Sequence, residues 1–118
     1  MKRLFITLAA AAVLGFSLNA ADKPGYPGGD SALNQYIKAN LKYPSYAMEN
    51  GVEGVVTIGF VVAPDGSLSN LKVMKMVDPD LESEAMRLVE GMPKWIPAEK
   101  DGTPVEAPSQ VNIPFILE

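Results

Sequence analysis

The chain has 118 residues, neither cysteine nor histidine, and a formal net charge of −4. This length leaves room for one domain with one modest core. Without cysteine there is no disulfide, thiolate metal site or lipid anchor on a cysteine, and without histidine the commonest general base and metal ligand are missing. The acidic balance argues against nucleic acid as a partner, because its phosphates require clustered Lys and Arg.

Residues 1–21 are predicted to be an export signal. Lys2 and Arg3 precede an uncharged apolar run, and Ala20 and Ala21 supply small residues for cleavage. A retained membrane anchor is the alternative, but about 15 helical residues span only about 22 Å of a roughly 30 Å hydrocarbon core. We therefore expect cleavage and a periplasmic or extracellular location. The loss of Lys2 and Arg3 lowers 10 basic residues to 8, against 14 acidic ones, which gives a mature charge of −6.

A tether and two helices should follow the signal. Residues 22–29 are dense in Pro and Gly, which favours a short tether. A helix is expected next, with Asp30 or Ser31 as its N-cap and an end before Pro44, which pushes the preceding residue away from helical angles. Pro44 suits the first turn of a second short helix, with Gly51 at its C-terminal cap.

A β-hairpin is predicted for residues 52–77. Residues 52–63 alternate, with β-branched side chains on two rather apolar faces. Such a strand lies in the middle of a sheet, or a helix, the tether or a partner subunit covers its second face. Pro64-Asp65-Gly66 predicts a tight reversal, and residues 67–77 the returning strand.

A helix and a final strand complete the expected fold. Asp78 should cap a helix that starts at Pro79. A loop is expected over residues 98–103, and a last strand over residues 104–117. The order helix, short helix, strand, strand, helix, strand predicts an α+β two-layer sandwich over residues 30–118, in which helices cover one face of a small three-stranded antiparallel sheet.

Two prolines bear on where the last strand lies. Pro108 and Pro114 cannot donate to a β-ladder, so they place this strand at a sheet edge or leave it partly irregular. An edge strand is an opportunity for binding, because its outer backbone groups are unpaired.

Most other conspicuous side chains are expected to pack. Trp95 should clamp its loop to the sheet, Tyr43 and Tyr46 should pack, and the mature methionines should fill gaps. Tyr26 either folds back onto the sheet or meets a partner. The acidic residues near residue 80 complement a helix dipole, and no catalytic or metal-ligand motif appears. We therefore predict a protein that is not an enzyme and has no cofactor or metal.

Several short motifs, in this order and spacing, resemble one known domain. They are Tyr26-Pro27-Gly28-Gly29, Tyr43-Pro44 with Gly51 and Gly54, Asp65-Gly66, the run from Met92 through Trp95 to Ala98, and Gly102-Thr103-Pro104-Val105. Together they make residues 26–117 similar to the C-terminal domain of TonB-type energy transducers, in a stand-alone secreted form of the Bacteroidetes type.

The resemblance implies a protein-binding function in outer-membrane nutrient transport. Such a domain adds an extended segment of an outer-membrane receptor as a strand beside its last strand and transmits force to the receptor plug. The implied binding residues in this chain are Ser109, Gln110, Val111, Asn112, Ile113 and Phe115. Their backbone should bind the partner, while the side chains of the apolar ones pack in the core. Proline at residue 111 or 112 is therefore expected to harm binding more than stability.

Two alternatives remain beside the receptor-binding module, which would act as an adaptor or a competitor of full-length transducers. A full transducer has an inner-membrane anchor and a long Pro-rich spacer, whereas residues 22–29 reach only about 28 Å. The chain would be a minor transducer if its N-terminus stays in the membrane. It would be a self-associating module if its exposed edge forms a homodimer by edge pairing or strand exchange.

Overall fold

The computed structural model describes residues 23–117, so the predicted export signal lies outside the described residues. In chain order the elements are α1 (Gly29–Asn40), α2 (Ser45–Glu49), β1 (Gly54–Val62), β2 (Leu68–Lys75), α3 (Pro79–Glu90), β3 (Ala98–Lys100), β4 (Thr103–Val105) and β5 (Ala107–Phe115). This order confirms the predicted α+β fold and adds a short hairpin before the last strand.

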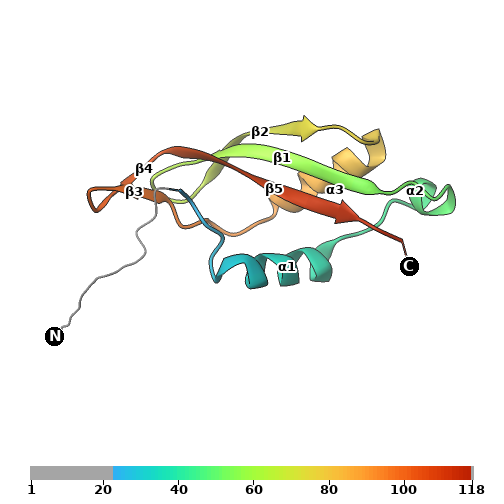
Figure 1. Cartoon of the computed structure of the whole chain (residues 1–118), viewed down its shortest axis with the longest axis horizontal. Coiled ribbons are helices and arrows are strands. Elements are labelled where there is room, and N and C mark those ends of the chain that lie inside the picture. The colour runs from blue at the N-terminus through green and yellow to red at the C-terminus, as the bar shows by residue number, and fades with distance from the viewer. Residues whose placement is uncertain (1–22, 118) are drawn as a thin grey trace.

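One antiparallel sheet of three strands forms the scaffold. Its strand order is β2-β1-β5, so β1 lies in the middle (Figure 1). A central position was one of the two explanations expected for the apolar character of both faces of this strand. Four even-numbered residues of β1 are buried, with exposed fractions of 3% or less: Val56, Ile58, Phe60 and Val62. They share one core cluster with Ile37 of α1 and Leu88 of α3. The helices therefore cover one face of the sheet, as predicted.

The region after Trp95 differs from the prediction. The expected loop over residues 98–103 is largely a hairpin, because β3 pairs with β4 from Ala98 and Val105 to Lys100 and Thr103. Its two turn residues, Asp101 and Gly102, have φ angles of 54° and 79°. Two positive φ angles in a two-residue connection match the twist of an antiparallel pair, and Asp-Gly favours them. The predicted last strand is accordingly divided into β4 and the longer β5.

The Pro/Gly segment before α1 contacts the domain in the described residues. The amide of Gly25 donates to the carbonyl of Ile96 over 3.0 Å, and the amide of Ile96 donates back over 2.8 Å. The Tyr26 ring lies 5.9 Å from Trp95 and 6.1 Å from Tyr36, measured between ring centroids. Of the two expectations for Tyr26, the structure shows packing onto the domain.

The helix starts were predicted with mixed success. Asp78 is the N-cap of α3, and its carboxylate accepts hydrogen bonds from two amides of the first turn, which confirms that prediction. The prediction of Asp30 or Ser31 as N-cap of α1 is wrong. Gly28 is the N-cap, at a φ of 90°, and no side chain caps the helix. The chain turns sharply just before α1, and glycine adopts that left-handed conformation without steric cost.

Aromatic packing holds the segment around Trp95 against the sheet. Trp95 is 6% exposed and meets Phe60 of β1 edge to face, with 4.9 Å between ring centroids. Tyr43 packs edge to face on Phe115 at 5.6 Å. The predicted packing roles of Trp95 and Tyr43 are confirmed.

Four side chains that were expected to pack inside are exposed instead. Their exposed fractions are 64% for Tyr46, 52% for Met48, 53% for Met74 and 77% for Met76. The short helix α2 buries only Ala47, so the residues on either side of it point away from the core. Met74 lies near the end of β2, an edge strand, and Met76 follows just after that strand. The packing prediction is wrong at these four positions.

Candidate functional site

The six residues predicted to bind a partner all belong to β5: Ser109, Gln110, Val111, Asn112, Ile113 and Phe115. The three apolar ones are 4% exposed or less, which confirms their expected packing in the core. Gln110 and Asn112 are exposed, and Ser109 is half-buried opposite Phe60. An added segment therefore has access to the backbone of β5 rather than to its apolar side chains.

β5 is a regular edge strand. It pairs with β1 at every position from Ala107 to Phe115 without a register shift. Within residues 23–117, no strand pairs with its other side. This confirms the edge position that Pro108 and Pro114 predict, and it excludes an irregular strand. A long, regular edge offers a row of backbone groups to another chain.

β2, at the opposite edge of the sheet, is irregular. Its pairing with β1 shifts register between Thr57 and Ile58 and again between Gly59 and Val61. Asn70, inside the second irregularity, has a φ of 53°. Bulges bend a strand and interrupt the spacing of its backbone groups, which protects an edge from pairing. Of the two edges, β5 is the one suited to strand addition.

The sheet face opposite the helices adjoins this edge. On this face, the Thr57 hydroxyl of β1 donates a hydrogen bond to the side-chain oxygen of Asn112 on β5, over 2.8 Å. A depression of about 580 Å³ is lined by Gly59, Met74 and Gln110, among others, one from each strand. The sequence prediction did not include this face in the site. The available signal was the alternation of residues 52–63, which put Thr57 and Gly59 on one face of the strand without deciding which face is the core.

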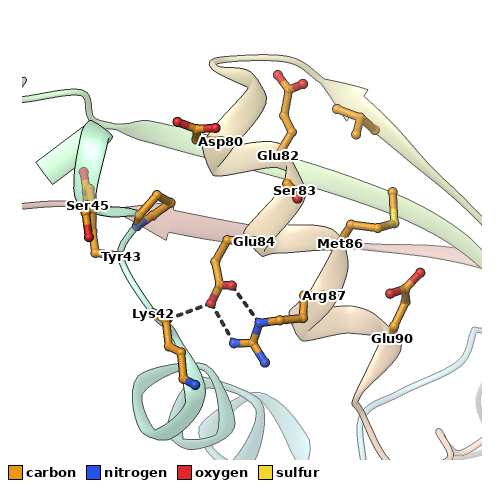
Figure 2. A pocket seen from close by; sticks show the side chains of 12 residues that line it. Lys42, Tyr43, Ser45, Asp80, Glu82, Ser83, Glu84, Met86, Arg87 and Glu90 are labelled. Atoms are coloured by element: carbon orange, nitrogen blue, oxygen red, sulfur yellow. Dashed lines mark hydrogen bonds and ion pairs between the residues drawn. The ribbon is translucent and has the colours of Figure 1, made fainter.

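A larger hollow of about 850 Å³ lies beside α3 and the segment between α1 and α2 (Figure 2). Glu84 receives two hydrogen bonds from the Arg87 guanidinium and one from the Lys42 amide, each at 2.7 Å. Arg87 also donates to the carbonyl of Asn40 over 2.9 Å. The hydrogen bonds from Arg87 are the main reason that the pKa of Glu84 lies below its ordinary value. These hydrogen bonds join α3 to the end of α1, so we assign the cluster a role in stabilising the fold.

Replacing Glu84 by Gln is expected to lower the free energy of unfolding at pH 7 by about 1–3 kcal/mol, because hydrogen bonds to a charged group are lost. The loss should lie toward the lower end of this range, because the Arg87 side chain is half exposed and solvent screens its interaction with Glu84. The folded pKa lies below the ordinary 4.5, so this stabilisation is complete above about pH 4.5 and is lost as the pH falls through the folded value. Urea unfolding at several pH values measures the difference.

Glu90→Gln is the matched control, because Glu90 is an exposed residue at the end of the same helix. Its unfolding free energy should stay within about 0.5 kcal/mol of the parent protein. If the Glu84→Gln deficit were the same at pH 3 as at pH 7, the charge of Glu84 would have no part in stability.

The described part of the chain has neither a membrane-spanning helix nor a cluster of metal ligands. Among residues 23–117, no helix is both long and apolar enough to cross a membrane. The same residues contain no group of three His, Cys, Asp or Glu side chains placed to hold a metal ion. What they do offer is main-chain pairing along β5.

Comparisons with known proteins agree with this fold. The family described as Gram-negative bacterial TonB protein C-terminal matches residues 39–117. Two solution structures of the Helicobacter pylori TonB C-terminal domain are similar. One, of residues 179–285, is 23% identical, with a TM-score of 0.56 over 73% of this chain and 78% of that one. The other, of residues 194–285, is 22% identical, with a TM-score of 0.55 over 72% and 89%.

At these identities the structural likeness supports the fold alone. A search of curated proteins finds no match. The family match carries the assignment, because it spans well over half of the chain and contains all of the strands described above. The chain belongs to the Gram-negative bacterial TonB protein C-terminal family.

Proposed function

We propose that the mature chain is a periplasmic protein-binding module that recognises an extended segment of a TonB-dependent outer-membrane receptor or a related partner. Proteins of this family interact with outer-membrane receptors in energy transduction, and theirs is a protein-interaction domain. The segment would join the sheet as a further strand beside β5, in support of outer-membrane nutrient transport. The observation that carries this proposal is the regular outer edge of β5, contrasted with the bulged edge of β2.

The proposed contact is made chiefly by the backbone. The stretch of β5 that holds residues 109–113 and 115 would supply it through those backbone groups that point away from β1, because the apolar side chains of this stretch are committed to the core. Main-chain hydrogen bonds give such a contact its affinity, and alternate side chains of the incoming segment give it selectivity. Gln110 and Asn112 are the exposed β5 side chains, other than prolines, beside which those of the segment would lie.

The location in the envelope rests partly on the family, whose members are envelope proteins of Gram-negative bacteria. We further propose that residues 1–21 are a cleaved export signal, that residues 22–29 are a tether, part of which packs on the domain through Gly25 and Tyr26, and that the domain comprises residues 30–118. N-terminal sequencing of the exported protein tests this, with an expected start at Ala21 or Asp22. An intact N-terminus would instead favour the membrane-anchored transducer.

Self-association is the second candidate function. The same edge of β5 that would accept a receptor segment is able to pair with β5 of a second copy, because an unpaired edge does not distinguish the source of its partner. Light scattering of the exported protein separates the candidates. A stable dimer that binds no receptor peptide would favour self-association.

The direct test of the proposed function is a calorimetric titration. Synthetic peptides from the extended N-terminal segments of outer-membrane receptors are added to the mature protein, and a polyproline peptide of the same length is the control. We expect saturable one-to-one binding of at least one receptor peptide and none of the polyproline control, which has no backbone N–H within its proline run. Proteins captured from outer-membrane extract then identify the physiological partner. Failure of every receptor peptide to bind folded protein would contradict the proposal.

A further inference from the structure

The direction of each backbone group of β5 follows from hydrogen bonds at the ends of the sheet. The amide of Ala63, just after β1, donates to the carbonyl of Ser67, just before β2, over 2.9 Å. Ala63 therefore points its backbone toward β2. Successive residues of a strand point alternately to its two sides, so Val62 and the other even-numbered residues of β1 point toward β5. The unshifted pairing of β1 with β5 shows that this alternation is uninterrupted.

The pairing register transfers this alternation to β5. The even-numbered residues of β1 face the odd-numbered residues of β5, such as Ile58 opposite Val111 and Val56 opposite Ile113. Facing residues of a hydrogen-bonded pair exchange both bonds, so the odd-numbered residues of β5 use their backbone groups to bond β1. Of the six residues predicted to bind a partner, Ser109, Val111, Ile113 and Phe115 therefore have no backbone group left for it. The amide of Leu117, also odd-numbered, bonds the Glu53 carboxylate that precedes β1, over 2.6 Å, in agreement with this direction.

The even-numbered residues of β5 consequently point their backbone outward. These are Pro108, Gln110, Asn112 and Pro114. All are exposed, and within residues 23–117 no backbone hydrogen bond outside the sheet engages them. Proline has no N–H, but at these outward-pointing positions no N–H is needed for a hydrogen bond to β1, so the two prolines do not weaken the ladder. The outer edge thus presents carbonyls at all of these positions but N–H groups only at Gln110 and Asn112.

We propose that the prolines define a short, acceptor-rich window, in which the incoming segment receives hydrogen bonds only from the amides of Gln110 and Asn112. This inference rests on the proposed function and specifies its chemistry. The window from Pro108 to Pro114 spans about 20 Å at 3.3–3.4 Å per residue, which matches a segment of about seven extended residues. The segment must bring its own N–H groups to the β5 carbonyls, so prolines or N-methylated residues facing β5 are excluded from it.

The same alternation predicts different effects for proline at residues 111 and 112, which were expected from the sequence to behave alike. Val111 points its amide at β1, so Val111→Pro removes a ladder bond and should lower the unfolding midpoint. Asn112 points its amide outward, so Asn112→Pro should weaken binding about tenfold or more, through a lost donor and an unpaired carbonyl in the partner. Asn112→Ala is the reference variant, because it also removes the hydrogen bond with Thr57 but keeps the N–H. Asn112→Pro should bind about tenfold or more weakly than Asn112→Ala.

Residue-resolved amide hydrogen exchange of the mature protein tests the inference without any variant. In the free protein, the amides of Val111 and Ile113 should exchange slowly and those of Gln110 and Asn112 rapidly. A saturating seven-residue peptide from a receptor N-terminus should slow Gln110 and Asn112 at least tenfold. A peptide with N-methyl groups on the residues that face β5 should not.

The possible results distinguish the proposed window between Pro108 and Pro114 from the proposed receptor-binding function. If the receptor peptide binds but protects amides of β2 or none of β5, the window is overturned and the receptor-binding function remains. If no receptor peptide binds the folded protein, both are overturned. Slow exchange at Gln110 and Asn112 in the free protein, together with a dimer by light scattering, would overturn the window as a receptor site and assign it to self-pairing.

Discussion

Phe115→Ala is expected to lower the free energy of unfolding by about 3–5 kcal/mol, the range for large-to-small changes of buried aromatic residues. Phe115 is fully buried at the end of β5 and meets Tyr43 edge to face at 5.6 Å. The substitution leaves a cavity where the sheet adjoins the segment between α1 and α2, and it removes the aromatic pair as well. For a domain of about this size, thermal unfolding should occur on the order of 15 °C lower.

Ile116→Ala is the control for this result. Ile116 adjoins Phe115 but is 66% exposed, so its removal should change stability by no more than about 0.5 kcal/mol. Calorimetric unfolding of both variants at one pH gives the comparison. Comparable losses for both would mean that the C-terminal end of β5 frays and contributes little to the core, which would also weaken the case for this strand as a rigid binding edge.

The parts of the fold that were predicted correctly depend on neighbours in the sequence. Asp78 caps α3 through amides of its own first turn. The division of β1 into two faces follows from strict alternation, and Pro108 and Pro114 place β5 at an edge because a proline lacks an N–H wherever it lies. Each of these rules operates within a few residues, so the sequence alone sufficed.

The parts that were missed depend on contacts between distant segments. Gly25 is held by Ile96, far along the chain, which composition does not reveal. Tyr46 is exposed because α2 is too short to bury more than Ala47. In the candidate site, the sequence predicted the edge position of the last strand but not the direction of its backbone groups. That direction follows from the pairing of Ala63 with Ser67 and from the register with β1, which are properties of the assembled sheet.

The second large effect is expected at Gly66, in the turn between β1 and β2. Its φ is 91°, a left-handed conformation that costs a residue with a Cβ about 1–2 kcal/mol. An added Cβ would also collide with the carbonyl oxygen of Trp95 and approach the Cβ of Lys94 to 3.2 Å. Gly66 cannot simply shift away, because its carbonyl accepts the amide of Trp95 over 2.9 Å. Gly66→Ala should therefore cost about 3 kcal/mol or more, since overpacking adds its own 1–3 kcal/mol.

Gly102→Ala separates backbone strain from collision. Gly102 has a similar φ of 79°, but nothing lies within 4 Å of the position its Cβ would take, so only the strain of about 1–2 kcal/mol should appear. Trp95 is the only tryptophan of the chain, and its fluorescence reports directly on the contact with Gly66. We expect a shifted native emission maximum for Gly66→Ala and an unchanged one for Gly102→Ala. Equal losses of stability with unchanged emission in both would show that the segment around Trp95 adapts to the added methyl group, and the close approach at Gly66 would then not be what holds that segment to the hairpin.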